Sequence, residues 1–512
     1  MTAPILIGLD LGTTNIKALA FHTNGTIIAA SNVLTPTHYP QPGWAHYEAD
    51  EIWTAAISCL RQLTKQLENP EHIVSIGVSS FGETGFPLDA QGQSVYPGIA
   101  WFDQRTHAQM HWLEQNIGPD DLFRTTGLPI LSFYGLCKLL WLRDNEPDIF
   151  NHTAHWLSGA DYLVYRLCGV LATDFSLASR TMAMNLYQRR WADSLLNDVG
   201  VSAKIFPALT PSGTALAPVL PEIAQVTGVP VQTVVTICGH DHVCGAFALG
   251  INRPEKMLDS MGTAEVLFLP AGAPLDDPAV GQQGYSQGML AVQDEQFYFI
   301  LGGLYTSGGS AEWLRELTGI NESGEKISYE MLIAEASQVP PGSLGVHFLP
   351  YLRLANPPYA DPKARGAFIG LTTDAKRSVL FRAILEGVSY EARLNLETLL
   401  THLGTTQMPT LYATGGSTRN SLWMQIKASI HNQTIHIVDI AEAVTLGAAL
   451  MGGLAAGVYA NPSDALDAIN INQVAVKPNP KQTTLYETHY QQVYRHIHPT
   501  LQELHHTIYD LH

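Results

Sequence analysis

The first residues whose types and spacing could do chemistry are Asp10, Gly12, Thr13 and Thr14, which follow the apolar run at 5–9. The run is rich in Ile and Leu and has the length of a buried strand. The glycine allows a tight turn, and hydroxyls with free backbone N–H groups at such a turn suit phosphate oxygens. A carboxylate beside a phosphate needs a cation between them, so Asp10 indicates a divalent metal such as Mg²⁺. The alternative is a structural turn with a capping Asp.

A second group of reactive side chains follows the apolar run at 233–237 and comprises Cys238, His240, Asp241, His242 and Cys244. Residues of these types are the usual ligands of zinc. Their alternating positions share one face of an extended chain but diverge if the chain turns, and no second Cys/His cluster supports them. Asp241 could instead orient a substrate hydroxyl and accept its proton. The residues alone leave both interpretations open.

The second half of the chain repeats the Gly-Thr turn. Gly262 and Thr263 precede an apolar run at 266–269, which predicts another strand. Later, a strand predicted at 410–414 leads into Gly415-Gly416, and a helix is expected after it. Glycines at such a junction allow a ligand to approach the backbone closely. Two halves that each open with Gly-Thr at a strand turn could hold a nucleotide from opposite sides.

The elements that must position these residues alternate between strands and helices. Asn24-Gly25 between two apolar runs predicts a β-hairpin. Apolar residues on helical spacing predict a helix at 51–67, and a strand is predicted at 73–80. This order predicts a mostly α/β core. A chain of 512 residues is expected to form two large domains, with a boundary near 252–254.

Composition excludes several function classes. The chain carries 28 Lys+Arg against 46 Asp+Glu, a formal net charge of −18, and so has no general attraction for nucleic acid or anionic membranes. Five cysteines argue against a disulfide framework and favour a reducing compartment. The N-terminal residues do not resemble a signal peptide. No run reaches the ~18 apolar residues that cross a bilayer. We expect a cytoplasmic protein that binds neither nucleic acid nor membrane.

Two longer motifs resemble a known family. Residues 133–145 and 366–387 are similar to the two signatures of the FGGY family of carbohydrate kinases, in the actin/hexokinase/Hsp70 superfamily, and the resemblance extends over residues 5–459. Gly135 and Val379 each depart from these signatures at one position. The resemblance implies an α/β fold with two actin-like (ribonuclease H-like) domains around a deep nucleotide/sugar cleft. The expected parts are an N-terminal domain at 1–250, a C-terminal domain at 251–460 and a helical extension at 461–512.

The resemblance also implies roles for individual residues. Asp241 resembles the family's general base, and Asp10 resembles the aspartate that helps to hold Mg²⁺ near the phosphates of ATP. Glu312 stands where glycerol kinase-like members carry Gln. The residues implied in ATP binding are Thr13, Thr14, Lys17, Gly262, Thr263, Gly308, Glu312, Gly416 and Asn420.

The acceptor site departs most from the family's patterns. The residues implied in sugar binding are Glu83, Thr84, Trp101, Asp103, Asp241 and His242. At 81–84 the chain has Phe-Gly-Glu-Thr, whereas xylulokinase-like members carry Gln-Met-His-Gly and glycerol kinase-like members carry Gln-Arg-Glu-Thr. The missing Met-His pair weakens the case for xylulose, and the missing Arg weakens the case for glycerol further. Glu83 as a solvated loop residue and Trp101 as a core residue are the structural alternatives.

The sequence therefore predicts a sugar kinase that uses ATP and Mg²⁺. The expected acceptor is a terminal hydroxyl of a ketopentose or related polyol, with xylulokinase-like conversion of D-xylulose to D-xylulose 5-phosphate as the leading form. Gluconate, ribulose, glycerol and other polyols remain open as acceptors, and so does a homodimer. Two other classes are a metal-dependent hydrolase built on His240, Asp241 and His242, and a non-enzymatic nucleotide-switched module.

Overall fold

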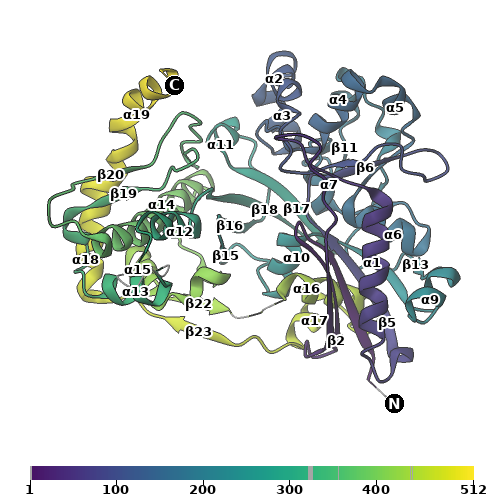
Figure 1. Cartoon of the computed structure of the whole chain (residues 1–512). Helices are drawn as coiled ribbons and strands as arrows, with labels where there is room; N and C mark the ends of the chain where they lie inside the picture. The colour runs from purple at the N-terminus through teal and green to yellow at the C-terminus, as the bar shows by residue number, and fades with distance from the viewer. Residues whose placement is uncertain (1–2, 321–326, 356, 439, 441, 512) are drawn as a thin grey trace.

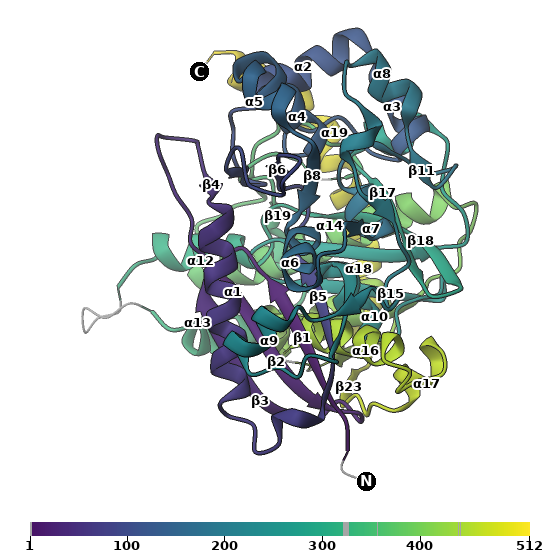
Figure 2. The same ribbon diagram turned by 90° about the vertical axis from the view of Figure 1, so that its right-hand side faces the viewer.

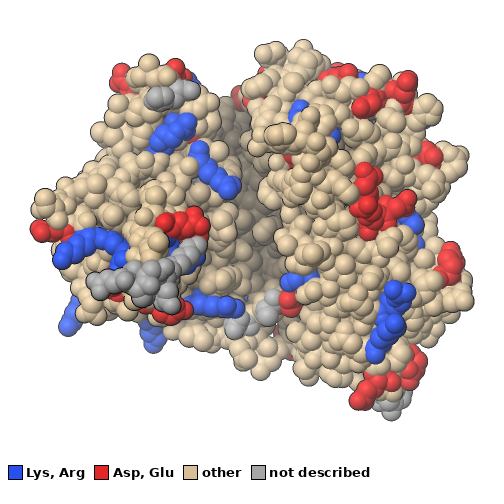
Figure 3. Space-filling model, in the orientation of Figure 1, with Lys and Arg blue, Asp and Glu red and all other residues tan. Residues whose placement is uncertain are grey.

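The computed structural model describes residues 3–320, 327–355, 357–438, 440 and 442–511. It has two α/β halves with a hollow between them (Figures 1 and 3). Among the described residues, no helix combines the length and the apolar character that crossing a bilayer requires.

The first sheet has six strands in the order β13-β14-β5-β1-β2-β3. Strands β1, β5 and β14 run parallel, whereas β1, β2 and β3 are joined as antiparallel neighbours. The predicted hairpin and the strand predicted at 73–80 are confirmed. The strands are β1 (Ile5–Leu11), β2 (Asn15–His22), β3 (Ile27–Leu34), β5 (Ile73–Ser80), β13 (Ala217–Pro218) and β14 (Val234–His240).

The second sheet repeats this order, since β18-β16-β15-β21-β22 corresponds to β3-β2-β1-β5-β14 in its sequence of antiparallel and parallel pairs. Two further strands, β17 and β23, extend its edges. The repeat supports the predicted pair of actin-like domains. The strands are β15 (Lys256–Met261), β16 (Glu265–Ala271), β17 (Ser286–Val292), β18 (Glu295–Leu304), β21 (Thr410–Thr414), β22 (Ile435–Val438) and β23 (Gln473–Val476).

Helices cover both faces of the first sheet. Alternate side chains of β1 therefore pack in two different cores, one on each face. Ile5, Ile7 and Leu9 pack in the core that includes α1 (Ala49–Thr64) and α6 (Gly159–Cys168). Figure 2 shows these two helices in front of the strands. On the other face, Leu6 packs with α10 (Asp241–Ala248) and α16 (Ala443–Ala455).

Helix α16 approaches the first sheet so closely that glycine is required in the strands. A Cβ on Gly8 would lie 1.9 Å from the carbonyl oxygen of Thr445, and one on Gly77 would lie 1.9 Å from that of Ala448. Both contacts are with backbone atoms and cannot be relieved by a rotamer change. The helix therefore belongs structurally to the first half, although its residues lie within the segment 251–460.

The C-terminal segment is not purely helical. Strand β23 pairs antiparallel with β22 and completes the second sheet. Beyond it, α18 (Pro480–His489) and α19 (Arg495–Asp510) follow, and the tyrosines Tyr486, Tyr490 and Tyr494 are buried in the core that α14 (Arg377–His402) runs through. The expected helical extension at 461–512 is thus corrected, because its first part supplies a strand to the second sheet.

A buried lysine ties the second Gly-Thr turn to a helix. Lys427 of α15 (Ser421–His431) is fully buried, pairs with Asp259 of β15 and places its Nζ 2.6 Å from Oε1 of Glu265 at the start of β16. The Oγ of Ser307 donates to the other oxygen of Glu265 at 2.7 Å. Burial, followed by repulsion from Glu265, raises the pKa of Asp259 to about 7. These charged side chains therefore hold the turn between β15 and β16 in place.

Replacement of this lysine should be costly. Lys427→Met leaves two buried carboxylates without their cation, so the free energy of unfolding should fall by about 3–5 kcal/mol. Denaturant titration followed by tryptophan fluorescence measures the change. Lys204→Met is the control, since Lys204 is exposed on the surface, and its effect should stay within about 0.5 kcal/mol. A loss below about 1 kcal/mol for Lys427→Met would contradict the structural role.

Candidate active site

Two pockets contain most of the predicted site residues. The first has a volume of about 340 Å³ and is lined from both halves, with Glu83 and Asp241 on one side and Glu265 and Tyr305 on the other. The second has a volume of about 970 Å³ and is lined by residues of the second half, from Gly262 to Trp423. We call them the acceptor pocket and the nucleotide pocket. Figure 3 shows the hollow between the halves.

Asp241 lies in the acceptor pocket, at the first position of α10 directly after β14. Its Oδ1 accepts a hydrogen bond of 2.6 Å from the backbone N–H of His242 and lies 3.2 Å from Nε2 of His240. Burial holds the pKa of His240 well below its usual value, so this ring is neutral. The neutral ring of His240 therefore lies beside the carboxylate of Asp241 without adding a positive charge to it. Burial raises the pKa of Asp241.

Asp10 lies near the end of β1 and is 8% exposed. The Oγ of Ser79 donates to its Oδ1 at 2.9 Å. Burial, and next the negative charge of Asp241, raises the pKa of Asp10 to about 7. Two carboxylates that repel each other in a buried site fit a divalent cation, and a carboxylate with bound waters is the ligand set that Mg²⁺ accepts. The predicted role of Asp10 as a metal ligand stays a prediction with this chemistry in its favour.

Glu83 lines the acceptor pocket as part of a buried ion pair that the sequence did not predict. Its Oε1 accepts from Nε of Arg180 at 2.6 Å and lies 2.5 Å from Nη2 of the same guanidinium. The backbone at Glu83 has φ of +67°, and its carbonyl accepts a 2.7 Å hydrogen bond from Nζ of the fully buried Lys138. Arg180 follows α7 (Phe175–Ser179). In the sequence, Arg180 stands out only as a single cation within a run of small and apolar residues.

Trp101, Thr13 and His242 also line the acceptor pocket. The indole Nε1 of Trp101 donates to Oγ1 of Thr13 at 3.0 Å. Thr13, which the resemblance assigned to ATP, therefore stands on the acceptor side of the cleft. The pocket also has apolar and aromatic walls that the sequence did not single out, from Phe81, Leu131, Phe133, Tyr134 and Tyr305.

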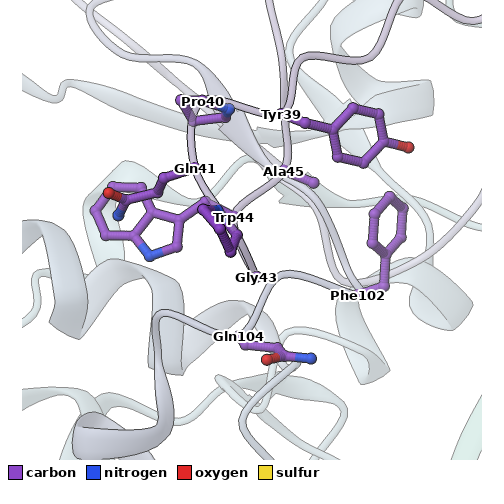
Figure 4. Close-up of a pocket in the computed structure, with 9 residues that line it drawn as sticks. Tyr39, Pro40, Gln41, Gly43, Trp44, Ala45, Phe102 and Gln104 are labelled. Carbon is purple, nitrogen blue, oxygen red and sulfur yellow. The ribbon is translucent and has the colours of Figure 1, made fainter.

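Asp103 and Thr84 do not line either pocket. Asp103 is buried, and both of its oxygens are occupied, because Arg105 grips them at 2.8 and 2.9 Å and the N–H of Ala45 donates to Oδ2 at 2.5 Å. Thr84 is buried as well. The loop that carries Asp103 borders a separate hollow of about 540 Å³ between Phe102, Gln104 and the residues 39–45, which contains none of the predicted site residues (Figure 4).

The nucleotide pocket brings together the second-half residues that the resemblance assigned to ATP. The turn after β15 is hydrogen-bonded to the start of α12 (Gly308–Leu317), since the N–H groups of Gly308 and Gly309 each donate at 3.0 Å, to the carbonyls of Gly262 and Thr263. Two exposed arginines, Arg353 and Arg419, line the pocket and were not predicted. The predicted residues that line it are Gly262, Thr263, Gly308, Glu312, Gly416 and Asn420.

Thr14 and Lys17 are not brought to this pocket. Thr14 is exposed, and its carbonyl accepts from the N–H of Thr35. Nζ of Lys17 lies 3.0 Å from both oxygens of Glu442 and borders a different hollow with Asn32 and Gln62. Lys17 faces this way because it belongs to β2, where the side chain is fixed by the strand alternation. Lys17 thus pairs with Glu442 just before α16 and does not line the nucleotide pocket, but its charge opposes the rise in the pKa of Asp10, and its role in ATP binding stays a prediction.

The structure gives no support to the zinc alternative. Among the described residues, no group of three or more His, Cys, Asp or Glu is arranged to hold a metal ion. Cys238 and Cys244 are fully buried, and their Sγ atoms lie 3.4 Å from the carbonyl of Ala448 and 3.1 Å from that of Cys238.

Comparisons with known proteins agree with this geometry. Residues 5–248 match the N-terminal domain and residues 257–456 the C-terminal domain of the FGGY family of carbohydrate kinases. The chain is 29% identical to an L-fuculokinase of Escherichia coli, over 91% of this chain and 95% of the relative. It is 31% identical to a glycerol kinase of Gloeobacter violaceus, over 92% of each. The crystal structure of a xylulose kinase from Rhodospirillum rubrum superposes with a TM-score of 0.88 at 25% identity, over 98% of this chain and 100% of that one.

A side chain at Gly308 should disturb the nucleotide pocket. A Cβ there would lie 2.5 Å from the carbonyl oxygen of Gly262, so α12 and the turn after β15 must separate. We expect Gly308→Ala to weaken ADP binding about tenfold, or about 1.4 kcal/mol. Calorimetric titration with ADP measures the affinity. Gly272→Ala is the matched control, because a Cβ at Gly272 meets no atom within 4 Å. Equal affinities for the two variants would contradict this account of the pocket.

Proposed function

Because the chain belongs to the FGGY family of carbohydrate kinases, we propose that it transfers the γ-phosphate of ATP to a terminal hydroxyl of a ketopentose or related polyol. A xylulokinase-like conversion of D-xylulose to D-xylulose 5-phosphate is the leading form of the proposal. The observation that carries it is the position of Asp241, a carboxylate with a raised pKa, in a pocket between the two halves.

The acceptor pocket suits one monosaccharide. Its volume of about 340 Å³ is at the small end of ligand sites, and its walls combine aromatic rings with few polar groups. Asp241 would hold the terminal hydroxyl and accept its proton as the new P–O bond forms. The backbone N–H of His242 holds one oxygen of this carboxylate at 2.6 Å, and the buried ring of His240 packs beside it.

ATP fits the larger pocket in this proposal. Its phosphates would lie along the turn at Gly262-Thr263, close to the N-terminus of α12, where the positive end of the helix dipole favours anions. Asp10 would hold Mg²⁺ through water molecules, and the bound ion would neutralise the charge on the phosphates.

One short turn separates the two pockets. Gly262 and Thr263 line the nucleotide pocket, whereas the next residues, Ala264 and Glu265, line the acceptor pocket. A phosphoryl group bound at this turn in the nucleotide pocket would therefore lie next to a sugar bound in the acceptor pocket. This arrangement supports direct transfer between two bound substrates, which needs the attacking and leaving oxygens in line.

The first test is ADP release with Mg-ATP over a panel of ketoses, aldoses, polyols and sugar acids. We expect at least one neutral sugar to stimulate ADP release. Asp241→Asn should lower kcat about 10²–10⁴-fold, because the base is lost, with ADP binding unchanged. Asp294→Asn is the control, since Asp294 is exposed in the turn between β17 and β18. No stimulation by any acceptor, or full turnover by Asp241→Asn, would overturn the proposal.

The pH profile gives a second test. Asp241 must be ionised to accept a proton, so kcat should fall as pH drops through its pKa. Burial and the charge of Glu83 raise this pKa above the ordinary value of 3.8, against the opposing effects of His242 and Arg180. The acid limb of kcat should therefore have its midpoint above pH 3.8, measured by ADP release at saturating substrates. A midpoint at or below that value would show that another group limits the rate.

A further inference from the structure

We infer that Arg180 and Glu83 form a hydroxyl-reading pair in the acceptor pocket, which selects neutral sugars against sugar acids. The inference rests on the proposed function and assigns Arg180, which no sequence motif indicated, as a determinant of specificity. Both side chains line the acceptor pocket and are nine-tenths or more buried, with exposures of 9% and 8%.

The pair leaves one donor and one acceptor for a ligand. Nε and Nη2 of Arg180 both contact Oε1 of Glu83, at 2.6 and 2.5 Å. Within the part of the chain that the structure describes, no donor reaches Oε2 of Glu83. Among the described residues, the only hydrogen bond of Nη1 of Arg180 is a long one, 3.4 Å to Oγ of Ser286, and the guanidinium lies 5.0 Å from the ring centroid of Tyr134. One sugar hydroxyl can donate to Oε2, and a neighbouring hydroxyl can accept from Nη1. In a buried ion pair with only a structural role, both of these atoms would already be hydrogen-bonded to the protein.

The local sequence makes room for this guanidinium. Gly82 stands where glycerol kinase-like members carry Arg, and a Cβ at Gly82 would lie 3.2 Å from Cγ of Arg180 and 3.1 Å from the ring of His240. A side chain at position 82 would therefore crowd both Arg180 and His240. The pocket carries its arginine on the segment that follows α7 and not at position 82.

Charge in the pocket then sets the acceptor class. Glu83 already neutralises Arg180, and Asp241 adds a negative charge nearby when ionised. A sugar carboxylate placed at Nη1 of Arg180 would stand beside the carboxylates of Glu83 and Asp241 with no further cation to balance it, and this repulsion is unfavourable in a pocket with little water. Hydroxyl groups meet no such penalty, because they donate to a carboxylate and accept from a guanidinium.

The decisive variants are Arg180→Met and Glu83→Gln. Their kinetics are measured with the best neutral acceptor of the panel and with an aldonate of the same carbon number as inhibitor. Arg180→Met should raise the KM for the acceptor at least about tenfold through loss of charge-assisted hydrogen bonds, while the KM for ATP stays unchanged. Glu83→Gln keeps the size of the side chain but releases Arg180, so the aldonate should inhibit at least about tenfold more strongly.

Arg166→Met is the matched control, because Arg166 also bridges a carboxylate and an aromatic side chain, Asp50 and Tyr162, but lies outside both pockets. It should leave both KM values unchanged. An unchanged acceptor KM in Arg180→Met, a parallel rise of both KM values, or preference of the wild-type enzyme for the aldonate would overturn the inference. If Arg180→Met does not fold, the aldonate inhibition of Glu83→Gln decides.

Binding separates this inference from the proposed function. Trp101 lines the pocket, so its fluorescence reports sugar binding without turnover. If no sugar is phosphorylated, the proposed function fails. The inference fails separately if Arg180→Met binds neutral sugars as tightly as the wild-type protein.

Discussion

The structure depends on two carboxylates that lie close enough to repel each other in a buried site. Asp10 lies near the end of β1 and Asp241 follows β14. Burial, and next the charge of Asp241, raises the pKa of Asp10, and burial raises the pKa of Asp241. Repulsion of this kind destabilises the folded protein unless a bound ligand relieves it. A cation beside Asp10 and a hydroxyl beside Asp241 are the ligands that relieve it. The cleft is thus arranged for its substrates more than for its own stability.

Repetition of one strand order gives each half of the molecule a turn at the corresponding place in its sheet. In each half the strand that opens the sheet, β1 or β15, turns into an antiparallel partner and is followed on its other side by parallel strands. Both turns therefore lie at corresponding edges. Helix α16 fixes the first half from behind, where Gly8 and Gly77 admit its backbone against the strands. A methyl group at either position would push this helix away from the sheet that carries Asp10.

The sequence predicted the parts of the site that lie at strand ends. Asp10, Asp241, Gly262 and Thr263 could be found because an apolar run followed by Gly and polar residues is a local pattern. Arg180 could not, since a single cation after a five-residue helix has no pattern of its own and meets Glu83 only through the tertiary fold.

Lys17 shows how tertiary contacts redirect a side chain. It lies close to the first turn in sequence, yet its Nζ pairs with Glu442, which is 425 residues away. The expectation of a purely helical C-terminal extension failed for a similar reason, since the addition of β23 to the second sheet is not encoded locally. The pairing partner of an edge strand is a property of the assembled sheet.

The turn between the pockets places a limit on how transfer can occur. Glu265 lines the acceptor pocket and is bound to Lys427 of α15 and to Ser307. Asn420, the residue directly before α15, lines the nucleotide pocket. Gly308 and Gly309 add hydrogen bonds to the carbonyls of the turn itself. A segment held by buried charges and backbone bonds on both sides is stiff, so it cannot itself carry a phosphoryl group toward the sugar. For the transfer proposed above, the two substrates would then approach each other through movement of one half of the molecule relative to the other. An acceptor pocket lined from both halves is in keeping with such a movement.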